Sequence, residues 1–304
     1  MLARLARPSA LAARTISRNA PALAVQSRSM ALGPAASATE VSDELLDKLG
    51  TLSTQSLIDG LWVMGWPDAF IEGARPLEKG QKCVGRAVTL RFVPQRPDIA
   101  MDKPLGVNSP EYEAFEKCGP RNVLVMSSVG PWESVGGDIK FLRLKQLGLG
   151  GLVTDGSVRD TDEILSYGFP CFSYSTTPKQ GPAAMQPWEC DGVISCGKVV
   201  VRPGDAIIGD QDGVVCVPAS HAQQVYDIAH GREVIEGVIK EELVKSTRMR
   251  TQRAHKPHRR SAYAHHLNFT LLTFFCMRAQ TPARPAAIIH SSRQLSPSRP
   301  SASS

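Results

Sequence analysis

The acidic residues of this 304-residue chain are confined to its middle, which limits the part that can fold as a domain. No Asp or Glu precedes Glu40, and none occurs in residues 248–304. The first flank carries five Arg and the last carries ten Lys and Arg, so residues 40–247 have a net charge of −9 in a chain of +6. The acidic middle has the length of one domain. Because the positive charge lies in the flanks, the sequence predicts no nucleic-acid-binding face.

Residues 1–39 have the composition of an organellar transit peptide, because Arg is interspersed with many Ala and Ser and acids are absent. We therefore expect a location in the mitochondrial matrix. A disordered N-terminus and a true start at Met30 are the alternatives, and either would favour a cytoplasmic protein.

Residues 248–304 are basic and rich in Ser and Pro, a composition with little capacity to form a core, so we predict a disordered tail. Its apolar island, residues 267–277, is shorter than the about 20 residues that cross a bilayer, and no membrane span is expected. A contact with a membrane surface and an error in the predicted gene are the alternatives for this segment.

Helix-like and strand-like segments alternate through residues 40–247, which predicts an α/β layered, single compact domain. Residues 192–217 are rich in Val and Ile and contain Pro203-Gly204 and Asp212-Gly213, so they predict short strands joined by turns. The other predicted helices are 42–49, 53–64, 111–118, 138–147 and 221–245, and the other predicted strands are 83–93, 122–127, 151–154 and 171–174.

The segment from Asp138 to Glu163 combines the charged groups of an anion and metal site. Asp138 is followed after twenty residues by Arg159 and Asp160, and Glu163 lies one helical turn further on. Arg can grip a carboxylate with two parallel hydrogen bonds, and Asp is a hard oxygen ligand for Mg²⁺ or Mn²⁺. The sequence therefore predicts a site for a small anion and a divalent cation.

Two local features strengthen this prediction. The helix predicted at 138–147 begins after Gly136-Gly137, so its free backbone N–H groups favour a bound carboxylate or phosphate. The strand predicted at 151–154 ends in a turn, which places Arg159 and Asp160 at the carboxyl edge of a sheet, where ligands usually bind in open α/β sheets. The buried face of the helix is predicted to consist of Ile139, Leu142, Leu144 and Leu147.

The same residues have a structural alternative. Asp160 could cap a helix that starts near Thr161, and Arg159 could be a solvated surface charge. Spacing by itself does not separate this alternative from a functional site, because short motifs need their structural context.

Residues 137–160, together with segments 188–193 and 201–215, resemble the 4-hydroxy-4-methyl-2-oxoglutarate aldolase family, which includes the regulator of ribonuclease activity A proteins. The resemblance spans roughly residues 50–245. Aldolase-competent members have Asp, twenty residues, Arg-Asp, two residues, and Glu or Asp, and this chain has every position. Regulator-type relatives typically lack the last acid, so Glu163 favours an enzyme.

The resemblance also implies roles for the site residues. Asp160 would ligate the Mg²⁺ or Mn²⁺ ion, and Asp138 would hold a water of the site. Lys140 departs from the apolar residue expected at its position. The implied catalytic residues are Arg159, Asp138 and Glu163, and the pyruvyl part of the substrate would be bound by the backbone of Gly137, Asp138, Ile139 and Lys140 and the side chain of Arg159.

The implied fold is a ββα swivelling-domain sandwich that assembles as a homotrimer or hexamer. The implied activity is that of a metal-dependent class II aldolase, or lyase, that cleaves 4-hydroxy-2-oxo dicarboxylic acids or decarboxylates oxaloacetate through a pyruvate enolate. Two alternatives stay open: a non-catalytic binding protein of the regulator type, and an enzyme of the same scaffold that acts on another 2-oxo or hydroxy acid.

Overall fold

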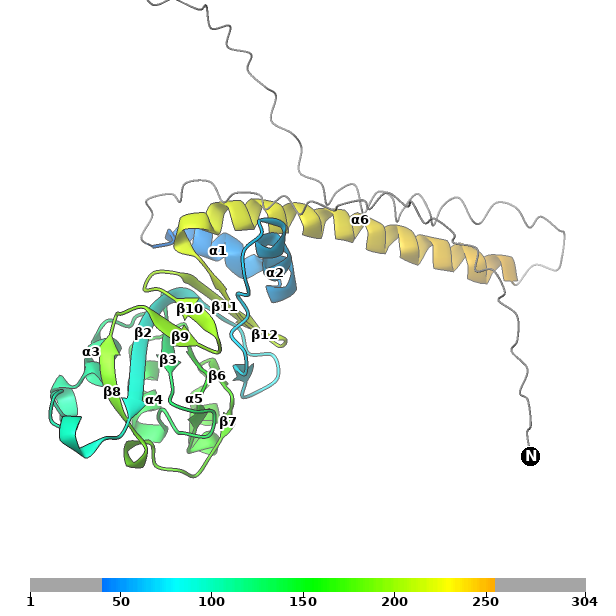
Figure 1. Ribbon diagram of the computed structural model, residues 1–304. Helices are drawn as coiled ribbons and strands as arrows, with labels where there is room; N and C mark the ends of the chain where they lie inside the picture. Colours follow the sequence, from blue (N-terminus) through cyan, green and yellow to red (C-terminus); the bar gives the residue numbers. More distant parts are fainter. Residues whose placement is uncertain (1–39, 255–304) are drawn as a thin grey trace, which may run out of the picture. The chain divides into compact units, whose positions relative to one another are not determined.

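The computed structural model describes residues 40–254, with side chains for residues 40–246 (Figure 1). The predicted transit peptide and the apolar island at 267–277 lie outside the described residues. The helices are α1 (Asp43–Thr51), α2 (Thr54–Val63), α3 (Pro110–Glu116), α4 (Asp138–Gln146), α5 (Thr161–Tyr167) and α6 (Ala222–Ala254), with short 3-10 turns η1 (Pro97–Ile99), η2 (Gly106–Asn108), η3 (Gly181–Ala183) and η4 (Ala219–His221). The strands are β1 (Arg75–Pro76), β2 (Cys83–Pro94), β3 (Asn122–Ser127), β4 (Gly151–Thr154), β5 (Ser157–Val158), β6 (Cys171–Ser173), β7 (Ser175–Thr176), β8 (Met185–Cys190), β9 (Ile194–Cys196), β10 (Val199–Val201), β11 (Ala206–Asp210) and β12 (Gly213–Val217).

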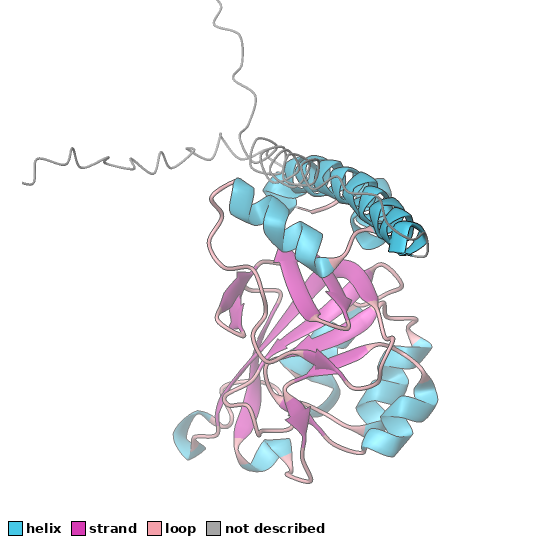
Figure 2. Ribbon diagram, turned by 90° about the vertical axis from the view of Figure 1, so that its right-hand side faces the viewer, coloured by secondary structure: helices cyan, strands magenta, loops and turns pink. Residues whose placement is uncertain are grey.

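An eight-stranded mixed sheet forms the centre of the domain (Figure 2). Seven strands follow the order β1-β6-β4-β3-β2-β11-β12, and the eighth, β8, pairs with β2 outside this order. Strands β2, β3, β4 and β6 run parallel. The long strand β2 pairs with β3 along one edge, while its other edge is shared by antiparallel β11 at its start and β8 at its end. The strongly curved, nearly closed sheet with its helices confirms the predicted mixed α/β fold.

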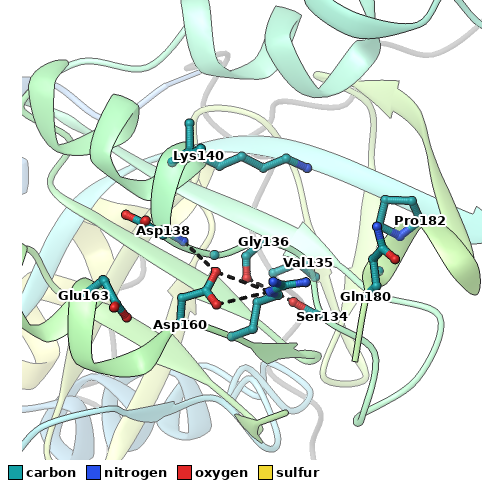
Figure 3. A pocket seen from close by; sticks show the side chains of 13 residues that line it. Ser134, Val135, Gly136, Asp138, Lys140, Asp160, Glu163, Gln180 and Pro182 are labelled. Carbon is teal, nitrogen blue, oxygen red and sulfur yellow. Dashed lines mark hydrogen bonds and ion pairs between the residues drawn. The ribbon is translucent and has the colours of Figure 1, made fainter. Parts of the chain in front are cut away.

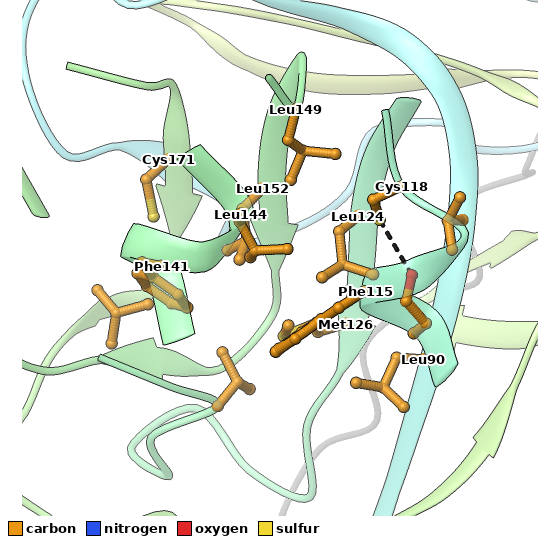
Figure 4. Packing of buried hydrophobic residues seen from close by; sticks show 14 of the residues in the cluster. Leu90, Phe115, Cys118, Leu124, Met126, Phe141, Leu144, Leu149, Leu152 and Cys171 are labelled. Carbon is orange, nitrogen blue, oxygen red and sulfur yellow. Dashed lines mark hydrogen bonds between the residues drawn. The ribbon is translucent and has the colours of Figure 1, made fainter. Parts of the chain in front are cut away.

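Helices α3, α4 and α5 cover one face of the sheet and bury its largest apolar cluster (Figure 4). Strand residues such as Leu124 and Leu152 meet Phe115 of α3 and Phe141 of α4 there, and all four side chains are fully buried. Their burial removes apolar surface from water, which is the main favourable term in folding. This packing fixes the position of α4, whose first turn forms the functional site described below.

Two further apolar clusters complete the domain. The β9–β10 hairpin packs on the opposite face of the sheet, where Ile194 and Val201 are buried with Val153 and Phe172. Helices α1, α2 and the first turns of α6 cover β11 and β12, and α6 continues beyond them (Figure 1). Among the described residues, no helix is long and apolar enough to cross a membrane.

Most predicted elements agree closely with the observed ones, but β8 was not predicted and α6 is longer than predicted. Strands 122–127 and 151–154 have the predicted bounds. Ser42 and Ser53 cap α1 and α2, accepting hydrogen bonds from the backbone N–H groups of Leu45 and Ser56 at 3.3 and 3.2 Å. Helix α6 ends at Ala254 instead of 245, so it continues into the segment predicted as a tail.

Candidate active site

The loop before α4 runs beside β5 and brings the two halves of the charged motif together. Ser134 and Ser157 form a parallel bridge, and the N–H of Arg159 donates to the carbonyl of Gly136 at 3.1 Å. The start of α4 therefore lies next to Arg159 and Asp160, although twenty residues separate them in sequence. Strand β4 ends at Thr154 as predicted, and a second short strand, β5, lies between it and Arg159.

Asp160 is held in an unusual backbone conformation. Its φ of 58° lies in the left-handed region, which Asp tolerates better than most residues. It occupies the N-cap position of α5, but its side chain does not cap that helix. Its Oδ2 instead accepts from the N–H of Asp138 at 3.2 Å, and both carboxylate oxygens lie 3.3 Å from Nε of Arg159. The helix-capping alternative for Asp160 is therefore wrong.

The first turn of α4 presents backbone donors beside this carboxylate. Helix geometry leaves the first N–H groups without an intrahelical acceptor, and α4 has no side-chain cap. The N–H of Asp138 is used by Asp160, which leaves those of Ile139 and Lys140 for a ligand. A Cβ on Gly137 would stand 2.3 Å from Oδ2 of Asp160, so only glycine permits this close approach.

These groups line one open pocket of about 470 Å³ (Figure 3). The structure thus brings together all the residues predicted for the site. Within the pocket, Asp160 points toward Asp138, and Glu163 lies beside it on α5 (Figure 3). The predicted residues in the lining are Gly137, Asp138, Ile139, Lys140, Arg159, Asp160 and Glu163, and the remaining lining residues are Ser134, Val135, Gly136, Gln180, Gly181 and Pro182.

The buried face predicted for α4 was partly wrong. Ile139 is 79 % exposed and Leu142 is 39 % exposed, whereas the core side of the helix consists of Phe141 and Leu144. Phe141 packs edge-on against Phe169, with ring centroids 6.0 Å apart. The large aromatic ring buries more apolar area than Ile139 would, so it sets the orientation of the helix and leaves Ile139 at the pocket.

Tyr167 is a residue of the site region that sequence reasoning missed. Its hydroxyl donates a hydrogen bond to Oδ1 of Asp138, linking the end of α5 to the start of α4. This bond to a carboxylate, with burial and the nearby charges of Asp138, Glu163 and Asp160, raises the pKa of Tyr167 to about 12. Tyr167 lies four residues after Glu163 on the same helix, and that spacing is a signal that could have identified it.

Lys140 turns away from the acidic groups of the pocket. Its ammonium contacts both carboxylate oxygens of Glu111 on α3 at 2.7 Å, and the Glu111 side chain is only 7 % exposed. Figure 3 shows the Lys140 side chain extended toward the side of the pocket where Pro182 lies. The lysine that departs from the expected apolar residue thus neutralises a buried carboxylate.

The described residues contain no group of three or more His, Cys, Asp or Glu side chains arranged to hold a metal ion. A cation in the pocket would therefore have Asp160 as a protein ligand and would complete its shell with water and ligand oxygens. Mg²⁺ is commonly bound in this way, by one or two carboxylates together with water and substrate. The donors of the pocket fit such a cation and do not fit a structural zinc site.

The fold and pocket define a class of mixed α/β proteins in which a glycine-led helix start faces an Arg-Asp pair. Residues 40–216 match the RraA-like family, described as Aldolase/RraA, and the chain belongs to this family. The family includes 4-hydroxy-4-methyl-2-oxoglutarate aldolases and non-catalytic ribonuclease inhibitors. Membership therefore confirms the resemblance found in the sequence.

Individual relatives point to both branches of the family. A protein of Halalkalibacterium halodurans named "Putative 4-hydroxy-4-methyl-2-oxoglutarate aldolase" is 32% identical over 163 residues, which cover 52% of this chain and 70% of that protein. The structure of Streptomyces coelicolor RraAS2, described as an unusual member of the RNase ES inhibitor RraA protein family, is 30% identical with a TM-score of 0.61, covering 67% of this chain and all of that one. An uncharacterized protein from Pseudomonas syringae pv. tomato is 26% identical with a TM-score of 0.58, covering 68% and 95% of the two chains.

Proposed function

We propose that this chain is a divalent-metal-dependent carbon–carbon lyase that releases pyruvate from 4-hydroxy-2-oxo acids. The dicarboxylic 4-hydroxy-4-methyl-2-oxoglutarate type and oxaloacetate are the first substrates to test. The observation that carries the proposal is the convergence of Asp138, Arg159, Asp160 and Glu163 on one pocket of about 470 Å³. Each of these reactions develops negative charge on the oxygen of a pyruvate enolate, and the pocket offers donors for that charge.

The pyruvyl part of the substrate would bind between Arg159 and the start of α4. The contact of Arg159 with Asp160 is made by Nε, so its outer guanidinium nitrogens would be available to a ligand. The N–H groups of Ile139 and Lys140 and the positive end of the helix dipole favour the substrate carboxylate. Arg159 would then stabilise the oxygen that becomes negative as the bond breaks.

Asp160 would hold the divalent ion, with Mg²⁺ and Mn²⁺ as the candidates. Its carboxylate has only long contacts within the protein, at 3.2 and 3.3 Å, and its side chain is one-third exposed to the pocket. A bound divalent ion supplies Lewis-acid stabilisation of developing negative charge. Lys140 is paired with Glu111, so without a bound cation Arg159 would face the three carboxylates of Asp138, Asp160 and Glu163.

Asp138 and Glu163 would bind the water of the reaction and transfer its protons. One oxygen of Asp138 accepts the hydrogen bond from Tyr167, which fixes the carboxylate and leaves its other oxygen for a water. Glu163 reaches the same pocket from the first turn of α5. Tyr167 acts as a positioning residue, because it touches Asp138 and does not line the pocket.

The proposal extends to assembly and location. RraA-family proteins are typically oligomeric, which supports a homotrimer or hexamer for this chain. The Arg-rich, acid-free composition of residues 1–39 supports import into the mitochondrial matrix. Sedimentation of the purified protein tests the assembly, and imaging of the full chain beside a form lacking residues 1–39 tests the location.

The likeness to RraAS2 favours a second candidate, a non-catalytic protein that binds a ribonuclease. The complete charged motif, with Glu163 in the pocket, supports the lyase instead. A binding protein would give no pyruvate with any of these substrates and would retain ribonuclease by affinity capture.

Pyruvate release by the purified full chain tests the lyase. We expect turnover of 4-hydroxy-4-methyl-2-oxoglutarate or oxaloacetate in the presence of Mg²⁺ or Mn²⁺, and its loss on addition of EDTA. Asp160→Asn should lower kcat/KM by about 10²-fold, because it removes the anionic metal ligand. Asp162→Asn is the matched control, since Asp162 is an exposed neighbour outside the pocket. Release that continues undiminished in EDTA would refute the proposal.

A further inference from the structure

A second cavity adjoins the pocket and shares a wall with it. This side cavity has a volume of about 330 Å³. A ligand group that extends from the pocket past Lys140 and Pro182 would enter the side cavity. The residues common to both linings are Ser134, Val135, Lys140, Gly181 and Pro182.

The side cavity is lined mainly by apolar side chains. Phe92 and Met185 belong to the buried core and form its inner part. Met101 and Leu105, from the loop between β2 and α3, are 78 % and 66 % exposed. Apolar side chains with this much exposed surface are stabilised when an apolar group displaces the water around them. The other apolar residues of the lining are Ala100, Tyr112, Val135, Pro182 and Pro187.

The charged side chains in this lining are Lys140 and Glu111, and they neutralise each other. Both oxygens of Glu111 lie 2.7 Å from the Lys140 ammonium. A substrate carboxylate entering the side cavity would have to draw Lys140 away from Glu111. That exchange would leave Glu111, which is 7 % exposed, as an unpaired buried charge. The side cavity therefore disfavours a second carboxylate.

The other cation near the substrate is Arg159, which contacts Asp160 and would stabilise the enolate oxygen of the pyruvyl part. Across the combined linings of the pocket and the side cavity, Arg159 and Lys140 are the basic side chains. Neither is free to pair with an additional substrate anion. A dicarboxylic substrate would thus carry one carboxylate without a cationic partner in these linings, whereas a monocarboxylic substrate would not.

We propose that the side cavity receives the C4 substituent of a 4-hydroxy-2-oxo acid, and that the preferred substrate carries an apolar group there in place of a second carboxylate. The inference rests on the proposed lyase function and narrows its substrate class. In the reaction, the C4 hydroxyl loses its proton and becomes a carbonyl as the C3–C4 bond breaks. The electrons of that bond form the pyruvate enolate, whose C3 then takes up a proton. The products are pyruvate and an apolar aldehyde or ketone.

Binding of uncleavable ligands tests the side cavity independently of turnover. Neither 2-oxo-4-phenylbutanoate nor 2-oxoglutarate has a C4 hydroxyl, so neither can undergo this cleavage. By calorimetry with the full chain and Mg²⁺, we expect the phenyl compound to bind at least about tenfold more tightly. Equal binding, or tighter binding of 2-oxoglutarate, would overturn the inference.

Two variants of the same loop test whether the apolar group binds in the side cavity. Leu105→Arg places an uncompensated cation in the side cavity and should reverse the preference in favour of 2-oxoglutarate. Val107→Arg adds the same charge to the same loop, but Val107 is exposed and lies outside the lining, so the preference should persist. A preference that is identical in both variants would place the apolar group elsewhere and would refute the assignment.

Rates of cleavage distinguish the substrate preference of the side cavity from the lyase activity itself. We expect kcat/KM for 4-hydroxy-2-oxo-4-phenylbutanoate to exceed that for 4-hydroxy-4-methyl-2-oxoglutarate by about tenfold. Faster cleavage of the dicarboxylic acid would overturn the inference and leave the lyase intact. No pyruvate from either compound, with the binding preference retained, would refute the lyase and support the side cavity as an apolar subsite.

Discussion

Two acidic turns of the domain, at Asp205 and at Asp160, use the same side chain in opposite ways. Asp205 lies before β11, is buried, and accepts hydrogen bonds from the N–H groups of Arg202 and Ala219, both at 2.9 Å. Asp160 precedes α5, is partly exposed, and makes only contacts of 3.2 Å or more. The carboxylate of Asp205 is saturated by the backbone, whereas that of Asp160 keeps lone pairs directed into a pocket.

The difference shows how a structural acid can be told from a functional one in this fold. A buried carboxylate with every oxygen paired stabilises the turn that it closes. A carboxylate with unused lone pairs, next to unpaired backbone N–H groups and a guanidinium, adds little to stability and is available to a ligand. Substitutions in the two turns should therefore separate stability from activity.

The largest expected effect is the loss of activity in Arg159→Ala. Removing a group that stabilises negative charge in the transition state costs about 10² to 10³ in rate. Because Arg159 is 40 % exposed, we expect the thermal midpoint to change little. Pyruvate release and thermal unfolding measure the two quantities, with Arg143→Ala as the control, since Arg143 is an exposed residue of α4 outside the pocket. Full turnover in Arg159→Ala would contradict the assigned role.

Asp205→Ala should produce the opposite result, a loss of stability without a specific loss of kcat. It leaves two N–H groups without their acceptor, at a cost of about 2–3 kcal/mol in the free energy of unfolding. Denaturant titration measures this cost.

The pH dependence of Asp205 sharpens the contrast. Burial raises the pKa of Asp205 above its ordinary 3.8, so the folded state holds this proton more tightly than the unfolded state. This contribution to stability is present below pH 3.8 and is lost as the pH rises through the raised pKa. Asp205→Asn should remove that decline from the stability profile, and an unchanged profile would contradict the assignment.

Gly137→Ala tests the close approach of the two halves of the site. The new Cβ would displace the carboxylate of Asp160, and we expect kcat/KM to fall about tenfold. Its backbone conformation is extended, so the effect would come from the contact and not from φ. Gly119→Ala is the control, because its Cβ would have an ordinary 3.7 Å contact. Equal activities of the two variants would show that Asp160 tolerates displacement.

The smallest expected effect is that of Tyr167→Phe. Loss of the hydrogen bond to Asp138 should lower kcat about threefold and leave KM unchanged, because Tyr167 does not touch the substrate pocket. The pKa of Tyr167 is raised from its ordinary 10.0 to about 12, so the folded state holds the phenolic proton more tightly than the unfolded state. This contribution to stability is fully present below pH 10.0 and is lost as the pH rises through 12. Ultraviolet titration should show one tyrosine that ionises late in the natural protein and is absent in the variant. A KM that rises with kcat unchanged would contradict the positioning role.

Local patterns predicted most of the fold and the charged part of the site. Ser42 and Ser53 mark helix starts because a side-chain cap depends only on neighbouring residues. The spacing of Asp138, Arg159 and Asp160 indicated a shared site because a helix start and a strand end confine each group to a known edge.

Features that depend on packing between distant segments could not be predicted. The pairing of Lys140 with Glu111 joins two helices that no local pattern relates. Helix α4 has two apolar faces, and the one that contains Phe141 is buried through its contact with Phe169. Ile139 lies on the other face and is therefore exposed. The wall provided by Gln180 and Pro182 comes from a loop with no chemical motif.

The shared edge of β2 has a consequence for synthesis. One edge pairs with β3, which is synthesised soon after β2. The other edge pairs with β8 and β11, which are synthesised much later and end at Cys190 and Asp210. Until residue 210 has left the ribosome, the start of the longest strand has an open row of backbone donors and acceptors. Such an edge is a template for pairing with other chains. Nascent chains stalled before β11 should therefore aggregate, while chains stalled after β12 should not.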